Sequence, residues 1–86
     1  MFLYIYAIYD EKREEFTALF HFASQADAIR YFKYTLSSDP VLFDSRADYE
    51  LHLLGSFNKQ TAEYRSDKSI VLSGATVTLP KINIDE

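Results

Sequence analysis

The first hydrophobic run, residues 2–9 (FLYIYAIY), combines β-branched and aromatic residues without glycine or proline, and this pattern predicts a strand. Alternation divides its side chains between two faces, with Leu3, Ile5 and Ala7 on one and Phe2, Tyr4, Tyr6 and Ile8 on the other. Because both faces are apolar, we expect a central strand or one that a partner covers on its second side. The charged residues 10–15 (DEKREE) then predict a hairpin turn, and residues 16–23 (FTALFHFA) predict a second strand.

The pattern changes to a helical period after residue 23. Ser24 with Asp27 three positions later fits a capping box, which predicts a helix over residues 25–36. The apolar positions that should face the sheet are Ala28 or Ile29, Phe32 and Leu36. The outer and flanking positions are Arg30, Tyr31, Lys33 and Tyr34. Residues 37–40 (SSDP) end the helix, and Pro40 opens a short turn through residues 41–43.

The second half of the chain returns to strands. Residues 49–57 (YELHLLGSF) predict a third strand, with Tyr49, Leu51, Leu53, Gly55 and Phe57 on one face. The glycine indicates a bulge or a close approach of another backbone. A turn at residues 58–60 leads to a fourth strand around residues 61–65, and a further strand is expected within residues 69–72 or 75–79.

The order β–β–α–β–β, with one optional further strand, predicts the α+β class. We expect an antiparallel sheet of four or five strands with one helix packed on one face. Residues 1–80 should form a single domain and residues 81–86 a loose tail. Since one helix covers only one face, the other face, with Tyr4 and Tyr6, should meet solvent, a ligand or a second copy.

The aromatic content bears most directly on what covers the second sheet face. The 86 residues include 7 Phe and 7 Tyr but no Trp. A domain of this size buries only about 60–65% of the surface that its unfolded chain exposes. More rings are therefore present than the core needs, which indicates a self-association surface or a ligand platform.

Charge and targeting signals restrict the partners. The net charge of −4 counts against simple phosphate binding, because nucleic-acid binders are usually basic. Residues 1–9 lack the basic leader and the cleavage site of a signal peptide, and no apolar stretch reaches membrane-span length. With no Cys, disulfides and thiolate metal sites are impossible. These features predict a soluble intracellular protein.

Catalytic motifs are weak throughout the sequence. His21 and His52 lie singly in predicted strands, without the converging ligands of a metal site. Ser56 follows Gly55 but lacks the nucleophile-elbow pattern, and two glycines are too few for a phosphate loop. The carboxylates of residues 10–15 are expected to be solvated. We therefore expect a binding protein rather than an enzyme, with no cofactor and no metal.

Tyrosines give the best functional lead, since exposed rings stack on bases without reading their sequence. The predicted nucleic-acid-binding residues are Tyr4, Tyr6, Arg30, Lys33, Lys59, Arg65 and Lys68. The alternative is that these rings fill a core or a dimer interface. The residue pattern alone leaves both interpretations open.

Several segments resemble one protein family. They are residues 6–10 (YAIYD), the Phe-rich residues 16–23, residues 26–32 (ADAIRYF) and residues 48–57, which carry the pattern D-Y-x-L-x-x-L-G-x-F. Over roughly the first 65 residues the chain resembles the small nonstructural protein of gokushovirus-type microviruses, which are phages with single-stranded DNA. The resemblance implies a protein that is absent from the virion and that binds DNA.

Together, pattern and resemblance predict a phage accessory protein of the bacterial host cytoplasm. We expect it to form a homodimer and to bind single-stranded DNA during genome replication or packaging. The alternative is an adaptor that docks on a host or phage protein through its aromatic sheet face.

Overall fold

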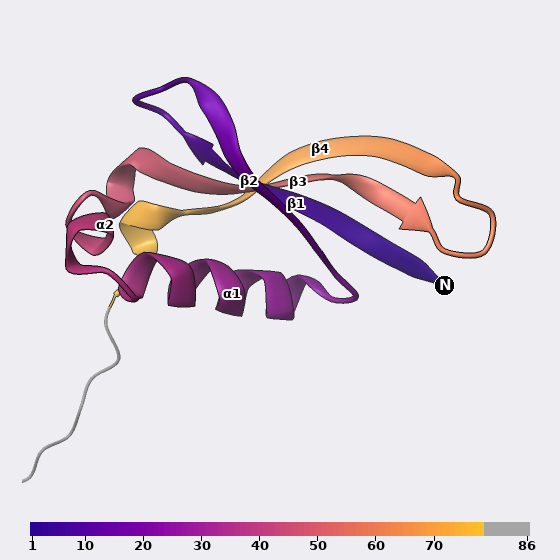
Figure 1. The fold of residues 1–86 in the computed structure, drawn as a ribbon, viewed down its shortest axis with the longest axis horizontal. Coiled ribbons are helices and arrows are strands. Elements are labelled where there is room, and N and C mark those ends of the chain that lie inside the picture. The colour runs from indigo at the N-terminus through magenta and orange to yellow at the C-terminus, as the bar shows by residue number, and fades with distance from the viewer. Residues whose placement is uncertain (79–86) are drawn as a thin grey trace, which may run out of the picture.

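A computed structural model describes residues 1–78 and forms one four-stranded antiparallel sheet with a helix on one face (Figure 1). The strands are β1 (Phe2–Asp10), β2 (Glu15–Phe22), β3 (Tyr49–Asn58) and β4 (Tyr64–Ser73), in the spatial order β2-β1-β3-β4. The helices are α1 (Gln25–Ser37), α2 (Pro40–Asp44) and the 3-10 turns η1 (Arg46–Asp48) and η2 (Gly74–Thr76). The predicted class and the order ββαββ are confirmed.

Helix α1 begins at the predicted cap. The Ser24 side chain accepts a hydrogen bond from the Asp27 backbone N–H at 3.3 Å, which satisfies one of the free donors of the first turn. Ala28, Phe32 and Leu36 are buried against the sheet, as their spacing predicts. Asp39 caps α2 in the same way, so the expected turn at residues 41–43 is a short helix.

The core lies between α1 and the two central strands. Its fully buried side chains include Tyr6 and Leu51 from the sheet and Phe32 from the helix. Tyr4 and Tyr6 share the face that α1 packs against, so their predicted place on the uncovered face is wrong, and Tyr6 is only 1% exposed. The helix covers the face of β1 that carries Tyr6 and Ile8, because the rings and branched chains of that face bury more area than Ala7 on the other.

A β-bulge in β3 corrects a second prediction. Ile5 pairs with Gly55 while Tyr6 pairs with Leu53, so the intervening Leu54 has no partner in β1. The extra residue reverses the alternation, and Gly55 therefore lies on the opposite face from Leu53. Phe57, opposite Leu3, shares the face of Gly55, and its predicted place beside Leu51 and Leu53 is wrong.

Gly55 lies where another backbone approaches closely, as its position predicted. A Cβ at residue 55 would lie 2.2 Å from the carbonyl oxygen of Arg65 and 2.7 Å from the Tyr64 hydroxyl. That hydroxyl donates a hydrogen bond to the Leu54 carbonyl at 3.1 Å. No side chain larger than glycine's fits without moving β4.

The last strand is longer than predicted. Residues 61–63 lie in the turn, with Ala62 at a positive φ of 65°, and Tyr64–Ser73 then runs as one strand. The two strands expected around residues 61–65 and 69–72 are therefore a single β4. The alternative strand at residues 75–79 is not formed by the described residues, of which Gly74–Thr76 make η2. The predicted tail at residues 81–86 lies outside the described residues.

Arg46 holds the segment after β4 against the rest of the domain. Its Nε donates to the Val77 carbonyl at 2.8 Å, and its Nη1 donates to the Phe43 carbonyl at 2.9 Å. The guanidinium also lies 4.0 Å from the centre of the Phe43 ring. Val77 is fully buried, so the Arg46 side chain holds a core residue in place at one end of the domain.

Replacing Arg46 with Ala should lower the free energy of unfolding by about 1–3 kcal/mol, because two partly buried carbonyls lose their donors. Arg46→Lys should recover only part of this loss, since one ammonium does not reproduce the two directed bonds. Urea unfolding measures both effects. Arg13→Ala is the matched control, with a side chain that is 73% exposed and an expected change within about 0.5 kcal/mol. Equal losses for Arg13→Ala and Arg46→Ala would contradict this role.

Candidate nucleic-acid interface

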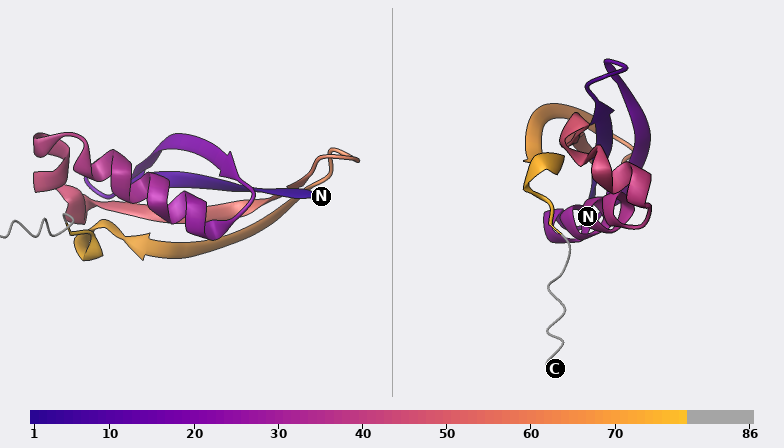
Figure 2. Two further views of the ribbon diagram at one scale, coloured as in Figure 1. Left: turned by 90° about the horizontal axis from the view of Figure 1, so that it is seen from below. Right: turned by 90° about the vertical axis from the view of Figure 1, so that its left-hand side faces the viewer.

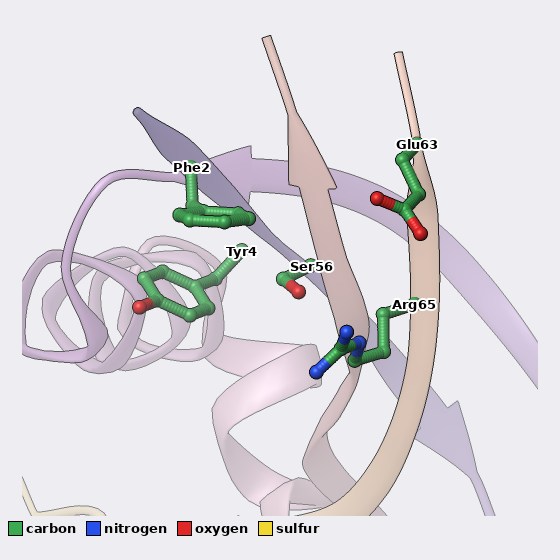
Figure 3. Close-up of a pocket in the computed structure, with 5 residues that line it drawn as sticks. All are labelled: Phe2, Tyr4, Ser56, Glu63 and Arg65. Carbon is green, nitrogen blue, oxygen red and sulfur yellow. The ribbon is translucent and has the colours of Figure 1, made fainter. Parts of the chain in front are cut away.

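A hollow of about 220 Å³ opens at the end of the sheet where β1 begins. Its lining residues are Phe2, Tyr4, Ser56, Glu63 and Arg65. Tyr4 lies opposite Ser56, which lies opposite Arg65, so one row across three strands places these side chains on one face. Figure 3 shows the two rings on one side of the hollow and the Arg65 guanidinium extending into the same space.

Tyr4 and Tyr6 share a face of β1 but differ in exposure, at 38% and 1%. The reason is the reach of α1, which covers Tyr6 and leaves the end of the strand open (Figure 1). Burial, and secondarily the neighbouring Tyr4, raise the pKa of the Tyr6 hydroxyl. Tyr4 therefore retains an accessible ring, whereas Tyr6 is part of the core.

The predicted cations lie at different places. Arg65 is in the hollow, while Lys68 is exposed farther along β4. Arg30 and Lys33 are exposed on α1, where Arg30 Nη1 lies 3.5 Å from an Asp27 oxygen. Lys59 is exposed in the turn after β3, and its backbone N–H donates to the Met1 carbonyl. The structure thus brings Tyr4 and Arg65 together and leaves the four other cations outside the hollow.

Three lining residues, Phe2, Ser56 and Glu63, were not predicted as binding residues. Phe2 shares the face of Tyr4 by simple alternation, so the sequence contained a signal for it. Ser56 gave no such signal, because only the bulge at Leu54 places it between Tyr4 and Arg65.

The electrostatics of the hollow are mixed. Arg65 offers one guanidinium for a phosphate, whereas the Glu63 carboxylate on the same wall repels one. This balance agrees with the overall charge of −4. An anion here gains little from charge alone, so the rings must supply most of any affinity.

The two histidines lie in strands, as predicted. His52 Nε2 lies 3.0 Å from Glu50 Oε1, and the rings of Tyr9 and Phe16 pack around the imidazole at 5.5 and 5.2 Å. His21 is exposed on β2. Among residues 1–78, no group of three or more His, Cys, Asp or Glu side chains is placed to hold a metal ion.

The sheet face opposite α1 carries exposed aliphatic side chains. Leu19, opposite Ala7, is 70% exposed, and Ile70, opposite His52, is 62% exposed. Phe16, opposite Tyr9, is also exposed. We call Phe16, Leu19 and Ile70 the uncovered face; it contains none of the predicted binding residues.

The chain forms a small α+β domain with an aromatic hollow at one end of its sheet, and a comparison with known families places it among phage proteins. The family described as "Phage ORF5 protein" matches residues 3–77, and the chain belongs to this family. No curated protein and no solved structure gave a significant match. In the part of the chain that the structure describes, no helix is long and apolar enough to cross a membrane.

Proposed function

We propose that this phage protein is an accessory factor that binds single-stranded DNA through the hollow at the start of β1. The observation that carries the proposal is the exposed Tyr4 ring beside the Arg65 guanidinium, with Phe2 completing the wall. The resemblance to the nonstructural protein of gokushovirus-type microviruses supports single-stranded DNA as the ligand and genome replication or packaging as the setting. The proposed role is binding, without catalysis.

Stacking supplies the affinity in this proposal. A base on an accessible aromatic ring contributes about 1–3 kcal/mol and needs no sequence-specific contact. Arg65 contacts one phosphate, and Glu63 disfavours a second one in the same hollow. A duplex keeps its bases stacked inside, so its bases do not reach Tyr4 and it binds less well than a single strand.

Replacing Tyr4 with Ala should weaken binding of a labelled oligothymidylate by about 1–3 kcal/mol, because a stacking surface is lost. Tyr4→Phe should bind like the wild-type chain, since the ring remains. Fluorescence anisotropy measures both affinities. Phe16→Ala on the uncovered face is the matched control and should leave the affinity unchanged. Equal affinities of the wild type and Tyr4→Ala would refute the platform.

Replacing Arg65 with Gln should reduce the salt dependence of binding. A single-stranded ligand loses about 0.7 in the slope of log K against log salt for each phosphate contact removed. Titrations at several salt concentrations measure this slope, with Lys12→Gln in the β1–β2 turn as the control cation. An unchanged slope in Arg65→Gln would show that this guanidinium contacts no phosphate.

The uncovered face supports a second candidate function, which is docking on another protein or on a second copy of the chain. Leu19 and Ile70 project from different strands of that face, and large exposed aliphatic groups favour protein contacts. Because this face is separate from the Tyr4 hollow, DNA binding and docking are compatible in one molecule.

A homodimer through this face should dissociate when charge is introduced. Light scattering at micromolar concentration should give a dimer mass for the wild type and a monomer mass for Leu19→Lys, because burial of an unpaired ammonium is unfavourable. Val41→Lys, at an exposed position of α2, should remain dimeric. A monomeric wild type would end the homodimer proposal and leave only a heterologous partner.

A further inference from the structure

A second hollow adjoins the first one on the helix side of the sheet. It has a volume of about 420 Å³ and is lined by Phe22, Asp27, Arg30, Tyr31 and Tyr34. Its composition repeats that of the first hollow, with accessible rings beside one guanidinium and one carboxylate. Of its residues, only Arg30 was among the predicted binding residues.

The inner wall of this hollow is held in place by packing. The Tyr31 ring lies 4.8 Å from Phe20 and 5.6 Å from Phe22, centre to centre, and Phe20 and Phe22 meet edge to face at 5.7 Å. Tyr34, one helical turn on from Tyr31, is 70% exposed. A flat ligand would therefore meet one ring held by packing, Tyr31, and one exposed ring, Tyr34.

The register of the sheet connects the two hollows. Phe22 of the second hollow lies opposite Tyr4 of the first, which lies opposite Ser56 and then Arg65. Neighbouring strands are about 4.8 Å apart, so this row spans about 14 Å from β4 to β2. A four-stranded sheet surface of this kind accommodates two or three stacked bases in other single-strand binders.

We infer that the second hollow is the next nucleotide subsite of the same strand, so that single-stranded DNA crosses β4, β3, β1 and β2 and ends against α1. The inference rests on the proposed DNA binding and extends it. One base stacks on Tyr4 and Phe2, and a neighbouring base lies against Tyr31 and under Tyr34. Arg65 and Arg30 contact phosphates at the two ends of the row.

The Arg30–Asp27 ion pair does not block this role. Its shortest contact is 3.5 Å, and the two side chains are 80% and 50% exposed. An exposed pair of this kind holds the guanidinium only weakly. A phosphate that arrives with its base already stacked can therefore take the place of the carboxylate.

The test uses the full chain and two probes, the single nucleotide thymidine monophosphate and hexathymidylate, titrated by tyrosine fluorescence. Tyr34→Ala should weaken hexathymidylate binding about fivefold to a hundredfold, because one stacking contact is lost. It should change binding of the single nucleotide less than twofold, since one base fills only the Tyr4 hollow. Tyr34→Phe should restore the wild-type affinity, and Arg30→Gln should lower the salt slope for hexathymidylate alone.

The outcomes distinguish a failure of the second subsite from a failure of DNA binding as a whole. If Tyr4→Ala weakens hexathymidylate binding and Tyr34→Ala does not, DNA binding stands and the second subsite is wrong. If Tyr34→Ala weakens both probes equally, the ligand lies on α1 and the continuous path is wrong. If the wild type binds neither probe, both proposals fail. Tyr34→Ala should stay folded because its ring is exposed, and circular dichroism checks this.

Discussion

One helix covers only part of one sheet face, and the distribution of aromatic residues depends on this constraint. The 13 residues of α1 extend about 20 Å at 1.5 Å per residue, whereas the 10 residues of β3 extend about 33 Å. Figure 2 shows the strands continuing past the helix toward the N-terminus. Side chains beyond the helix are left open even where their pattern matches that of the core.

This difference in length explains why two tyrosines of one alternating run have different roles. Tyr6 lies under α1, stacks near Phe20 at 6.3 Å and belongs to the core. Tyr4 lies two residues earlier on the same face and is accessible. Sequence alternation identifies the face of a residue but not the end of the covering helix. The sequence therefore predicted that Tyr4 and Tyr6 share a face, but not that the helix buries only Tyr6 of the two.

Local signals fixed the elements that the sequence predicted well. Ser24 and Asp27 placed the start of α1, and Gly55 indicated the bulge. The continuity of β4 was not predictable in the same way, because Ser66, Asp67, Lys68 and Ser69 interrupt the apolar pattern. Such polar residues suit an edge strand, where charge discourages pairing with other chains. The site was only partly predictable, because Gly55 indicates a bulge or a close backbone approach but not which neighbouring residue is left unpaired.

The bulge at Leu54 keeps the first hollow free of a large side chain from β3. Without the extra residue, alternation from Leu53 would place Gly55 and Phe57 on the face of Tyr4. The Phe57 ring would then occupy the face beside Phe2 and Tyr4. With the bulge, the small Ser56 lies between Tyr4 and Arg65, while Phe57 lies opposite Leu3 on the other face. A single inserted residue thus keeps a large ring out of the space between Tyr4 and Arg65.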